Sequence, residues 1–348
     1  MTVSAQALPP GLAVNIRPMF SYRHAFHAGN HADVLKHTTL IAVLRHLTQK
    51  NTALQVFDTH AGAGLYRLDG DYAQTSGEAA DGYLRLVQQP NMPPALASQA
   101  LPAIHHVANK RPDSTPPAPA LQDYLELVAS FNRSSGSGGS SGSGGHLVYP
   151  GSPFIIDHLL QGRDRDRLKL YELHPTDAKT LRANIAQLDA GRQITVLQED
   201  GFDGLKKFLP PPSRRALVLC DPSYELKTDY ARVVAMMTDA LQRFATGTYM
   251  VWYPIIPRPE AHDLPRKLKT LALRAGRPWL NATLTVKSSK LGHDDEGEVV
   301  RPGLPASGVL VINPPHTLKA LLTAALSQIA QALAQGKHQA FEVTSGGH

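Results

Sequence analysis

The sequence predicts an α/β fold with a mostly parallel sheet and a helical insertion. Short apolar segments that lead to an acidic residue recur along the chain, and helical stretches separate several of them. Strands that alternate with helices are typical of parallel sheets. One gap between two such segments is too long for a single strand–helix–strand unit. We expect the first four strands at residues 53–57, 168–171, 193–197 and 216–220, where they lead to Asp58, Glu172, Asp200 and Asp221.

The other elements are predicted from helical periodicity and from further apolar runs. A polar and aromatic segment, Ser21–His31, precedes the first helix, and Asn30 is a suitable N-cap for it, with Asp33 three residues later. Asn313–His316 is expected to form a turn. Further helices are expected at 176–188 and 229–244, and further strands at 248–253, 283–287 and 308–312.

The long gap predicts the division of the chain. Glu172 follows Asp58 by 114 residues, and this stretch holds two helix-like pieces, 79–88 and 121–131, broken by prolines. Residues 134–145 are only Ser and Gly, which is typical of a flexible loop. We therefore expect a flexible tail at 1–18, a sheet domain at 19–67 and 150–335, and an inserted helical subdomain at 68–149 that ends in this loop.

Composition limits the class of protein. The 348 residues are 42% apolar and 18% charged, and no apolar run approaches the roughly 18 residues of a membrane span. The start of the chain lacks the pattern of a secretory signal. The one cysteine, Cys220, cannot form an internal disulfide, which fits a reducing cytoplasm. A net charge of +6 permits a polyanionic partner without proving one. We expect a cytoplasmic monomer with no membrane contact.

The acidic strand ends are candidates for binding a nucleoside. Side chains at the carboxyl ends of parallel strands converge on one crevice. The turn Asp58–Gly64 holds two glycines that let backbone approach a ligand, and it holds no lysine for phosphate. Glu172 can bind both hydroxyls of a ribose, and Asp200-Gly201 lies where an adenine amino group needs an acceptor. A nucleoside without phosphates fits this set, and S-adenosyl-L-methionine is such a nucleoside.

The segment Asp221-Pro222-Ser223-Tyr224 is the reactive candidate. The amine of adenine is a poor nucleophile because its lone pair is delocalised. The carboxylate of Asp221 and the carbonyl of Pro222 can accept both amine hydrogens, which directs the lone pair toward a sulfonium methyl group. Tyr224 would stack on a base that has left its helix. The alternative is a plain turn, for which Asp, Pro and Ser are common residues.

Two other features have weaker interpretations. Histidines at 24, 27, 31 and 37 suggest a metal site, but no acidic third ligand is well placed, so we expect no metal. Several Arg and Lys residues could contact phosphates, which position a nucleic acid without reading its sequence. Tyr22 and Arg23 are the better candidates for RNA contact, whereas Arg214 and Arg215, just before the fourth strand, should lie far from the crevice.

The chain resembles the RlmJ family of bacterial 23S rRNA adenine-N6 methyltransferases over roughly residues 20 to 315. The resemblance implies a Rossmann-like class I S-adenosylmethionine-dependent methyltransferase fold with an inserted small helical subdomain. It implies 23S rRNA as the substrate, either protein-free or in an early assembly intermediate. The matching segments are Ser21–His24, Phe26–His37, Asp58–Gly64, Tyr149–Pro153, Glu172–Pro175, Asp200–Gly201, Lys227–Tyr230 and Trp252–Pro254.

The resemblance also implies roles for individual residues. Asp221 is the acceptor for the target amine, with Pro222 and Tyr224 as its catalytic neighbours, and Tyr22 contacts the substrate together with Arg23 and Tyr224. The family's Asp-Pro-Pro-Tyr is Asp-Pro-Ser-Tyr here, because Ser223 replaces the second proline. The residues expected to contact the cofactor are His37, His60, Ser152, Glu172, Asp200, Gly201 and Asp221, to which we add Lys36 and Gly62.

Two alternatives remain open from the sequence. An enzyme that uses the same cofactor on DNA adenine or on a protein glutamine amide needs the same acceptor pair for a nitrogen. A catalytically idle RNA-binding relative is conceivable because of Ser223, although Asp221, Glu172 and the glycines are present.

Overall fold

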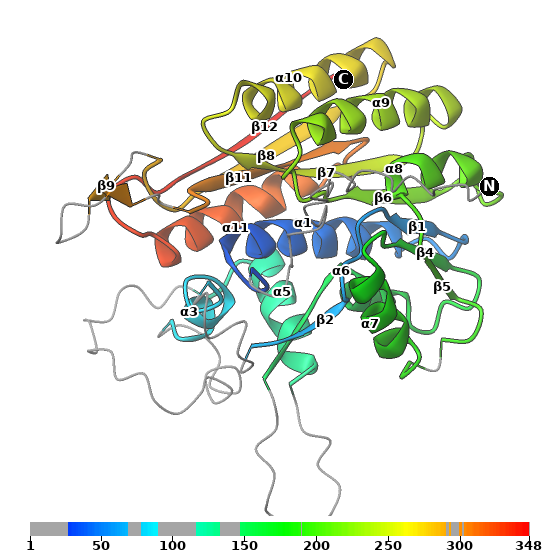
Figure 1. The fold of residues 1–348 in the computed structure, drawn as a ribbon, viewed down its shortest axis with the longest axis horizontal. Helices are drawn as coiled ribbons and strands as arrows, with labels where there is room; N and C mark the ends of the chain where they lie inside the picture. Colours follow the sequence, from blue (N-terminus) through cyan, green and yellow to red (C-terminus); the bar gives the residue numbers. More distant parts are fainter. Residues whose placement is uncertain are drawn as a thin grey trace, which may run out of the picture.

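The centre of the fold is an eight-stranded sheet in the order β12-β8-β11-β7-β6-β1-β4-β5 (Figure 1). The computed structural model describes residues 27–68, 78–89, 116–132, 147–188, 190–289, 292–293, 299–300 and 303–347. The strands of this sheet are β1 (Gln55–Asp58), β4 (Arg167–Tyr171), β5 (Ile194–Leu197), β6 (Ala216–Cys220), β7 (Thr248–Ile255), β8 (Trp279–Thr285), β11 (Ala306–Ile312) and β12 (Ala340–Gly346).

The five neighbouring strands β7, β6, β1, β4 and β5 are parallel to one another, whereas β11 pairs antiparallel with both β7 and β8. β12 pairs antiparallel with β8 at the edge of the sheet. The predicted α/β fold with a mostly parallel sheet is confirmed. The register aligns the strand ends, because Asp58 lies opposite both Leu170 of β4 and Leu219 of β6.

Helices cover both faces of the sheet (Figure 1). On one face, α9 and α10 lie over β6 and β7 and share a core with a 3₁₀ helix at Leu205–Phe208. On the other face, α1, α6, α7 and α11 pack on the sheet, and α5 packs on α1 and α11. The helices are α1 (His31–Leu47), α3 (Tyr83–Val87), α5 (Pro119–Ser130), α6 (Ser152–Leu160), α7 (Pro175–Ile185), α8 (Gly201–Gly204), α9 (Lys227–Arg243), α10 (Pro259–Arg274) and α11 (Leu318–Ala332).

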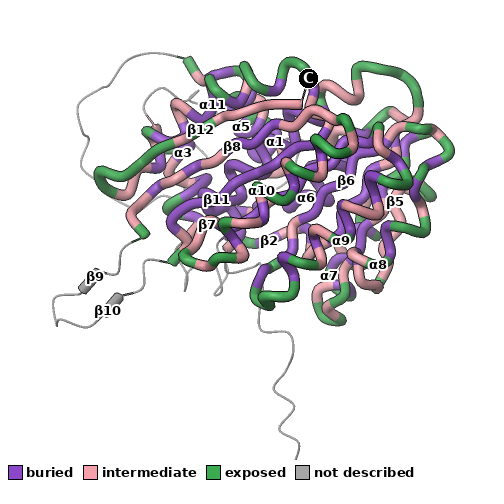
Figure 2. The backbone as a smooth tube through the Cα atoms, turned by 90° about the horizontal axis from the view of Figure 1, so that it is seen from above, coloured by how far each residue is buried: buried purple, intermediate pink, exposed green. Residues whose placement is uncertain are grey.

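The first helix begins where the sequence predicts. The side chain of Asn30 accepts hydrogen bonds from the backbone N–H groups of Ala32 and Asp33, and Asp33 in turn accepts one from the N–H of Gly29 at 2.9 Å. These bonds satisfy donors that a helix start leaves without partners. The first fourteen residues of α1 are buried, polar ones included, because the helix lies between the sheet and α5 (Figure 2).

A small two-stranded ladder joins the ends of the long stretch between β1 and β4. β2 (Leu65–Arg67) pairs antiparallel with β3 (Val148–Pro150), and the N–H of Leu68 donates to the carbonyl of Leu147 at 2.7 Å. α3 and α5 lie between these two strands in the chain. The division into an N-terminal tail, a sheet domain and an insertion at 68–149 stays a prediction, and residues 1–18 and 134–145 lie outside the described residues.

The last part of the chain differs most from expectation. β8 begins four residues before the predicted strand at 283–287, and β12 was not predicted, so the sheet extends to Gly346. The remaining two-stranded pair is β9 (Gly292–His293) with β10 (Val299–Val300). Asn313 follows β11, and because β11 runs antiparallel to β7, Asn313–His316 lies at the opposite edge of the sheet from Asp221. As expected, Asn313–His316 forms neither a strand nor a helix.

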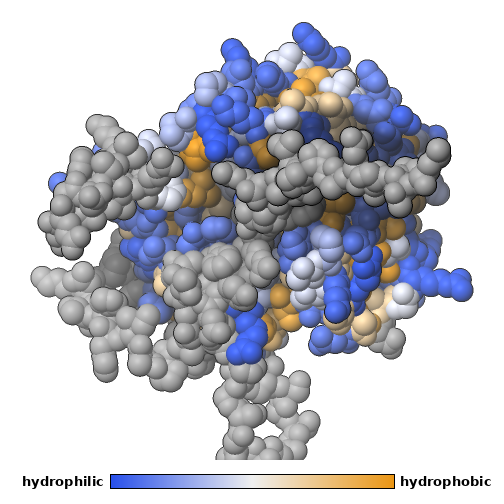
Figure 3. Space-filling view, viewed as in Figure 1, coloured by the Kyte–Doolittle hydropathy of each residue, from blue (hydrophilic) through white to orange (hydrophobic). Residues whose placement is uncertain are grey.

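Hydrophilic residues cover most of the described part of the face shown in Figure 3, with smaller apolar areas between them. Within the residues that the structure describes, no helix has both the length and the apolar character needed to cross a bilayer.

Candidate active site

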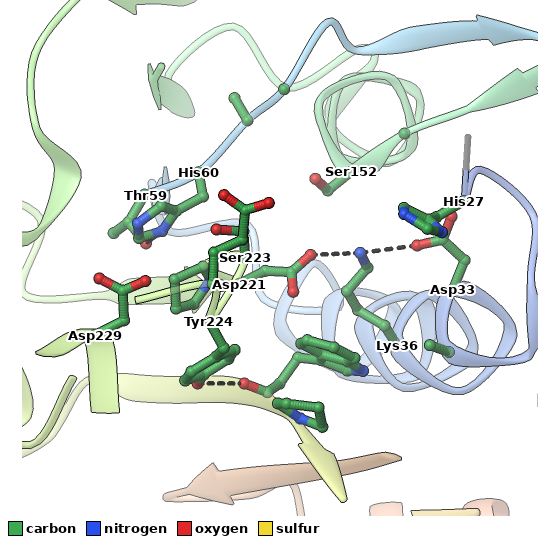
Figure 4. A pocket seen from close by; sticks show the side chains of 18 of the residues that line it. His27, Asp33, Lys36, Thr59, His60, Ser152, Asp221, Ser223, Tyr224 and Asp229 are labelled. Atoms are coloured by element: carbon green, nitrogen blue, oxygen red, sulfur yellow. Dashed lines mark hydrogen bonds and ion pairs between the residues drawn. The ribbon is translucent and has the colours of Figure 1, made fainter. Parts of the chain in front are cut away.

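A cavity of about 540 Å³ opens where the parallel strands end (Figure 4). Its volume is typical of a site for a small molecule. The strand ends of β1, β4 and β6 and the first turns of α1, α6 and α8 line the cavity. Eleven of the residues predicted for the site lie on its wall: Lys36, His37, His60, Gly62, Ser152, Glu172, Asp200, Gly201, Asp221, Pro222 and Tyr224.

The cavity wall is strongly acidic. Three cations, Lys36, Arg232 and Arg258, are outnumbered by eight carboxylates. Such a wall favours a cationic ligand and disfavours a phosphorylated one. The carboxylates belong to Asp33, Glu78, Glu172, Asp177, Asp200, Asp221, Glu225 and Asp229.

Asp221 is held by a buried lysine. The ammonium of Lys36 contacts Oδ2 of Asp221 and lies 2.8 Å from Oδ1 of Asp33, and its side chain is 5% exposed (Figure 4). Burial lowers the pKa of Lys36, but the two carboxylates outweigh burial and raise it, so the ammonium stays charged. No described residue makes a hydrogen bond with Oδ1 of Asp221, which leaves this oxygen for a ligand.

His37, the residue after Lys36 on α1, is oriented by Tyr149. Its Nδ1 lies 2.8 Å from the hydroxyl of Tyr149, whose ring stacks on the imidazole, and Tyr149 contacts the hydroxyl of Tyr124 at 3.1 Å. Tyr149 belongs to β3 and Tyr124 to α5. Two elements within the long stretch between β1 and β4 therefore orient a residue of the cavity wall.

The glycine turn after β1 is tied to Glu172. The N–H of Gly62 donates to Oε2 of Glu172 at 2.8 Å, and the N–H of His174 donates to Oε1 at 2.7 Å. Gly62 has φ of +60°, a conformation that favours glycine. Burial raises the pKa of Glu172, against the two backbone hydrogen bonds. Each carboxylate oxygen keeps a further lone pair that can accept from a ligand.

Asp58 departs from the expectation that all four strand-end acids face the crevice. Its carboxyl group is fully buried behind the cavity wall, where Oδ2 accepts from the hydroxyl of Ser152 at 2.6 Å. Burial raises the pKa of Asp58 to about 7. Ser152 begins α6 and lines the cavity, so Asp58 acts on the cavity through this hydroxyl.

The end of β5 forms a second polar corner. Asp200 caps α8 through the N–H of Phe202 and accepts from Arg232 at 2.7 Å. The guanidinium lies 4.4 Å from the centre of the Phe202 ring, whose other neighbour is His60 at 4.7 Å. Burial lowers the pKa of His60 to about 4, so its imidazole is neutral near pH 7.

Gly201 is required at this corner for a steric reason. A Cβ atom at this position would lie 2.0 Å from the carbonyl oxygen of Thr59. The start of α8 and the glycine turn can therefore approach one another only with a glycine here.

The reactive segment follows β6. Tyr224 has φ of +54°, is 2% exposed, and donates from its hydroxyl to the carbonyl of Trp252 at 2.7 Å (Figure 4). Its ring packs against Tyr230 and Trp252. Tyr224 is thus fixed in the wall, and its stacking on a target base stays a prediction. Ser223 is exposed at the cavity.

Sequence reasoning missed some residues of the wall. Asp33 was expected only to help cap α1, Trp252 was noted only within a segment that matches the family, and Phe202 and Arg232 were not singled out. The spacing of Asp33, Lys36 and His37 on α1 was a usable signal, because residues three and four apart share a helix face. Tyr22 and Arg23 lie outside the described residues. Within the described residues, no cluster of His, Cys, Asp and Glu has the makeup of a metal site.

Comparisons with known proteins show which proteins this chain resembles. The family model described as "Ribosomal RNA large subunit methyltransferase D, RlmJ" matches residues 51–119 and 108–343. The chain is 38% identical to "Ribosomal RNA large subunit methyltransferase J" of Escherichia coli, over 86% of this chain and 89% of that one. It is 36% identical to the protein of the same name from Haemophilus influenzae, over 90% and 94%.

A solved structure shares the fold. The crystal structure of a Legionella pneumophila protein is similar with a TM-score of 0.69 and 27% sequence identity, and the match covers 92% of this chain and 98% of that chain.

Proposed function

The chain belongs to the RlmJ family of ribosomal RNA large subunit methyltransferases, and we propose that it transfers the methyl group of S-adenosyl-L-methionine to the exocyclic N6 of one adenine in 23S rRNA. The observation that carries this proposal is the state of Asp221. A charged lysine contacts one of its oxygens, and its other oxygen is available at the cavity.

The residues of the cavity fit the proposed cofactor. S-adenosyl-L-methionine carries a sulfonium and an ammonium group, and the wall has eight carboxylates and no lysine in the glycine turn. Glu172 lies beside Gly62 where it can accept from ribose hydroxyls, and Asp200 and Gly201 form the corner suited to the adenine. His37, His60 and Ser152 complete the set of contacts. When bound, the cofactor supplies an electrophilic methyl group.

The residues of this chain act on the target amine. Oδ1 of Asp221 accepts one N6–H and the carbonyl of Pro222 accepts the other, which turns the nitrogen lone pair toward the methyl group. Lys36 is charged and contacts Oδ2 of Asp221, so it orients the carboxylate and leaves Oδ1 to accept the amine hydrogen. The proton that N6 loses on methylation can pass to Oδ1 of Asp221. Lys36 thus acts on the site through Asp221, while its predicted cofactor contact stays a prediction.

The family favours rRNA over the alternatives of DNA adenine, a protein glutamine and an idle RNA-binding relative. The test is to incubate the protein with S-adenosyl-L-methionine labelled at its methyl group and with protein-free 23S rRNA, duplex DNA or a protein extract. Digestion of the rRNA to nucleosides should show label only in N6-methyladenosine, at one mapped position. Label in DNA or protein but not in rRNA would contradict the proposal, as would cofactor binding without transfer.

A further inference from the structure

Positive charge gathers at the edge of the sheet opposite the cavity. The segments just before β1, β4, β5 and β6 lie side by side there. The N–H of Gln55 donates to the carbonyl of Arg215 and the N–H of Arg167 to that of Leu54, both at 3.0 Å, and the N–H of Leu168 donates to the carbonyl of Gln193 at 2.9 Å. We call the cations of these segments the basic edge: Arg45, Lys50, Arg163, Arg165, Arg167, Arg192, Arg214 and Arg215.

The basic edge accounts for the charge of the whole protein. Segments 45–55, 163–167, 190–194 and 213–216 hold these eight cations and two carboxylates, Asp164 and Asp166. Their net charge of +6 equals the formal net charge of the chain. The cavity edge is acidic by contrast, so the two edges of one sheet carry opposite charge.

Few cations of the basic edge are paired with an acidic side chain. Arg163 pairs with Asp166 at 2.5 Å, and Arg45 lies 3.7 Å from Asp123. The other six cations form no ion pair with any acid of the described residues. Neighbouring cations also lower the pKa of Arg215 and of His46 in addition to the effect of burial, as expected in a field of one sign.

Part of the basic edge has a structural role. Arg163 donates to the carbonyl of Thr48 at 2.9 Å, and Arg215 donates to those of Leu47 and Thr52, where cations complement the C-terminal end of α1. These carbonyls are neutral acceptors, so the guanidinium charge remains.

Helix capping does not explain the exposed members. The side chains of Arg192 and Arg214 form no hydrogen bond to the described residues, and both are exposed. Arg214 also holds φ of +54°, which is unusual for a residue other than glycine. Arg165 is exposed and donates only to the carbonyl of Asn51.

We propose that the basic edge is a second contact surface for the phosphate backbone of the rRNA, on the side of the sheet domain away from the cavity. The inference rests on the proposed function, because that function supplies a polyanionic substrate. The acidic cavity wall binds phosphates poorly, whereas Arg and Lys bind them without regard to base sequence. The starts of four adjacent strands span about 15 Å, at roughly 4.8 Å for each spacing.

The geometry predicts that the contribution of the basic edge to binding depends on the size of the RNA. Strand β6 has five residues, so the two edges are separated by at least about 16 Å. A short hairpin in the cavity would not reach the basic edge, whereas a large folded RNA can contact both edges. The basic edge should therefore contribute to the binding of 23S rRNA and not to turnover of a short hairpin that carries the target adenine.

The test compares two triple variants of equal charge change. Arg165→Gln/Arg192→Gln/Arg214→Gln alters exposed members of the basic edge, and Lys179→Gln/Arg266→Gln/Lys267→Gln alters exposed cations of α7 and α10. Filter binding over a range of KCl gives the dissociation constant for protein-free 23S rRNA and its dependence on salt. Methyl transfer to the hairpin is measured in parallel.

The basic-edge variant should bind 23S rRNA about tenfold more weakly or worse, and its salt dependence should be shallower by about 2 to 3 in slope. The α7 and α10 variant should stay within about twofold of the wild type, and both should methylate the hairpin at the wild-type rate. Equal RNA binding by the two variants would overturn the inference, as would an equal loss on hairpin and 23S rRNA. A wild type that methylates neither the hairpin nor 23S rRNA contradicts the proposed function, while the binding comparison still decides the inference.

Discussion

Lys36→Met removes the charge that holds Asp221 and keeps most of the side-chain volume. In the wild type the Lys36 ammonium lies between Asp33, which is 1% exposed, and Asp221, which is 14% exposed. The variant leaves two carboxylates at the cavity wall without a cation between them. Two such groups are expected to share one proton near pH 7, and protonated Asp221 would be a poorer acceptor for an amine hydrogen.

The structure sets the size of the effect. At 2.8 Å and an effective dielectric constant of 20, the attraction between Lys36 and Asp33 is about 6 kcal/mol before the cost of desolvation. Removing one partner of a buried pair typically costs about 3–5 kcal/mol, and we expect the free energy of unfolding to fall by that amount. The rate of methyl transfer should fall about 100-fold, the lower end of what a positioned proton acceptor contributes to a rate.

Urea denaturation and single-turnover methyl transfer measure these two effects. Lys36→Arg keeps the charge and is the matched control. Asp33→Asn/Lys36→Met removes one of the two negative charges that Lys36 lies between in the wild type and should recover stability and part of the transfer rate. A Lys36→Met protein that transfers methyl groups within about threefold of the wild type at pH 7 would refute this reasoning, as would a double variant no better than Lys36→Met.

Three further predictions concern the wall of the cavity. Glu172→Ala removes the acceptor beside Gly62 and should raise the dissociation constant of S-adenosyl-L-methionine by about 10- to 100-fold in calorimetry, so an unchanged constant would exclude the ribose contact. The pKa of Asp58 lies at about 7 in the folded protein against 3.8 ordinarily, so the folded state retains this proton to higher pH and the stability it confers is lost as pH rises from about 4 through 7. The free energy of unfolding of Asp58→Asn, measured by urea denaturation, should depend less on pH over this range, by up to about 4 kcal/mol, and a slope equal to that of the wild type would contradict the assignment. Gly201→Ala places a Cβ 2.0 Å from a backbone oxygen and should lower the melting temperature clearly. Gly162→Ala, where no atom lies within 4 Å of the added Cβ, has only the strain of its positive φ and should lower the melting temperature less.

The sequence predicted the parallel half of the sheet well for a physical reason. These strands are short runs rich in apolar residues, and each of the four leads to an acid, so β1, β4, β5 and β6 were found within two residues. β12 was missed because Ala340–Gly346 is an edge strand with only two large apolar residues, Phe341 and Val343, and it ends in Thr, Ser and Gly. β8 was placed late for a similar reason, since Asn281 interrupts its apolar pattern.

The sequence predicted which residues line the cavity better than it predicted which of them contact one another. Strand ends bring Glu172, Asp200 and Asp221 to one cavity by topology alone. The contact between Lys36 and Asp221 joins residues 185 positions apart, and it depends on how α1 crosses the sheet. Burial of Asp58 likewise depends on α6, whose first residue supplies the hydroxyl of Ser152. Neither contact leaves a signal in local sequence.

Asp221→Asn tests most directly whether the free oxygen of Asp221 accepts the target amine. Because Lys36 donates to one position of this side chain, the amide oxygen should turn toward Lys36 and its NH₂ group toward the amine, which places donor against donor. The rate of single-turnover methyl transfer to 23S rRNA should then fall by about 1000-fold or more, with the dissociation constant of S-adenosyl-L-methionine within about threefold of the wild type. Transfer at the wild-type rate by Asp221→Asn would contradict the account.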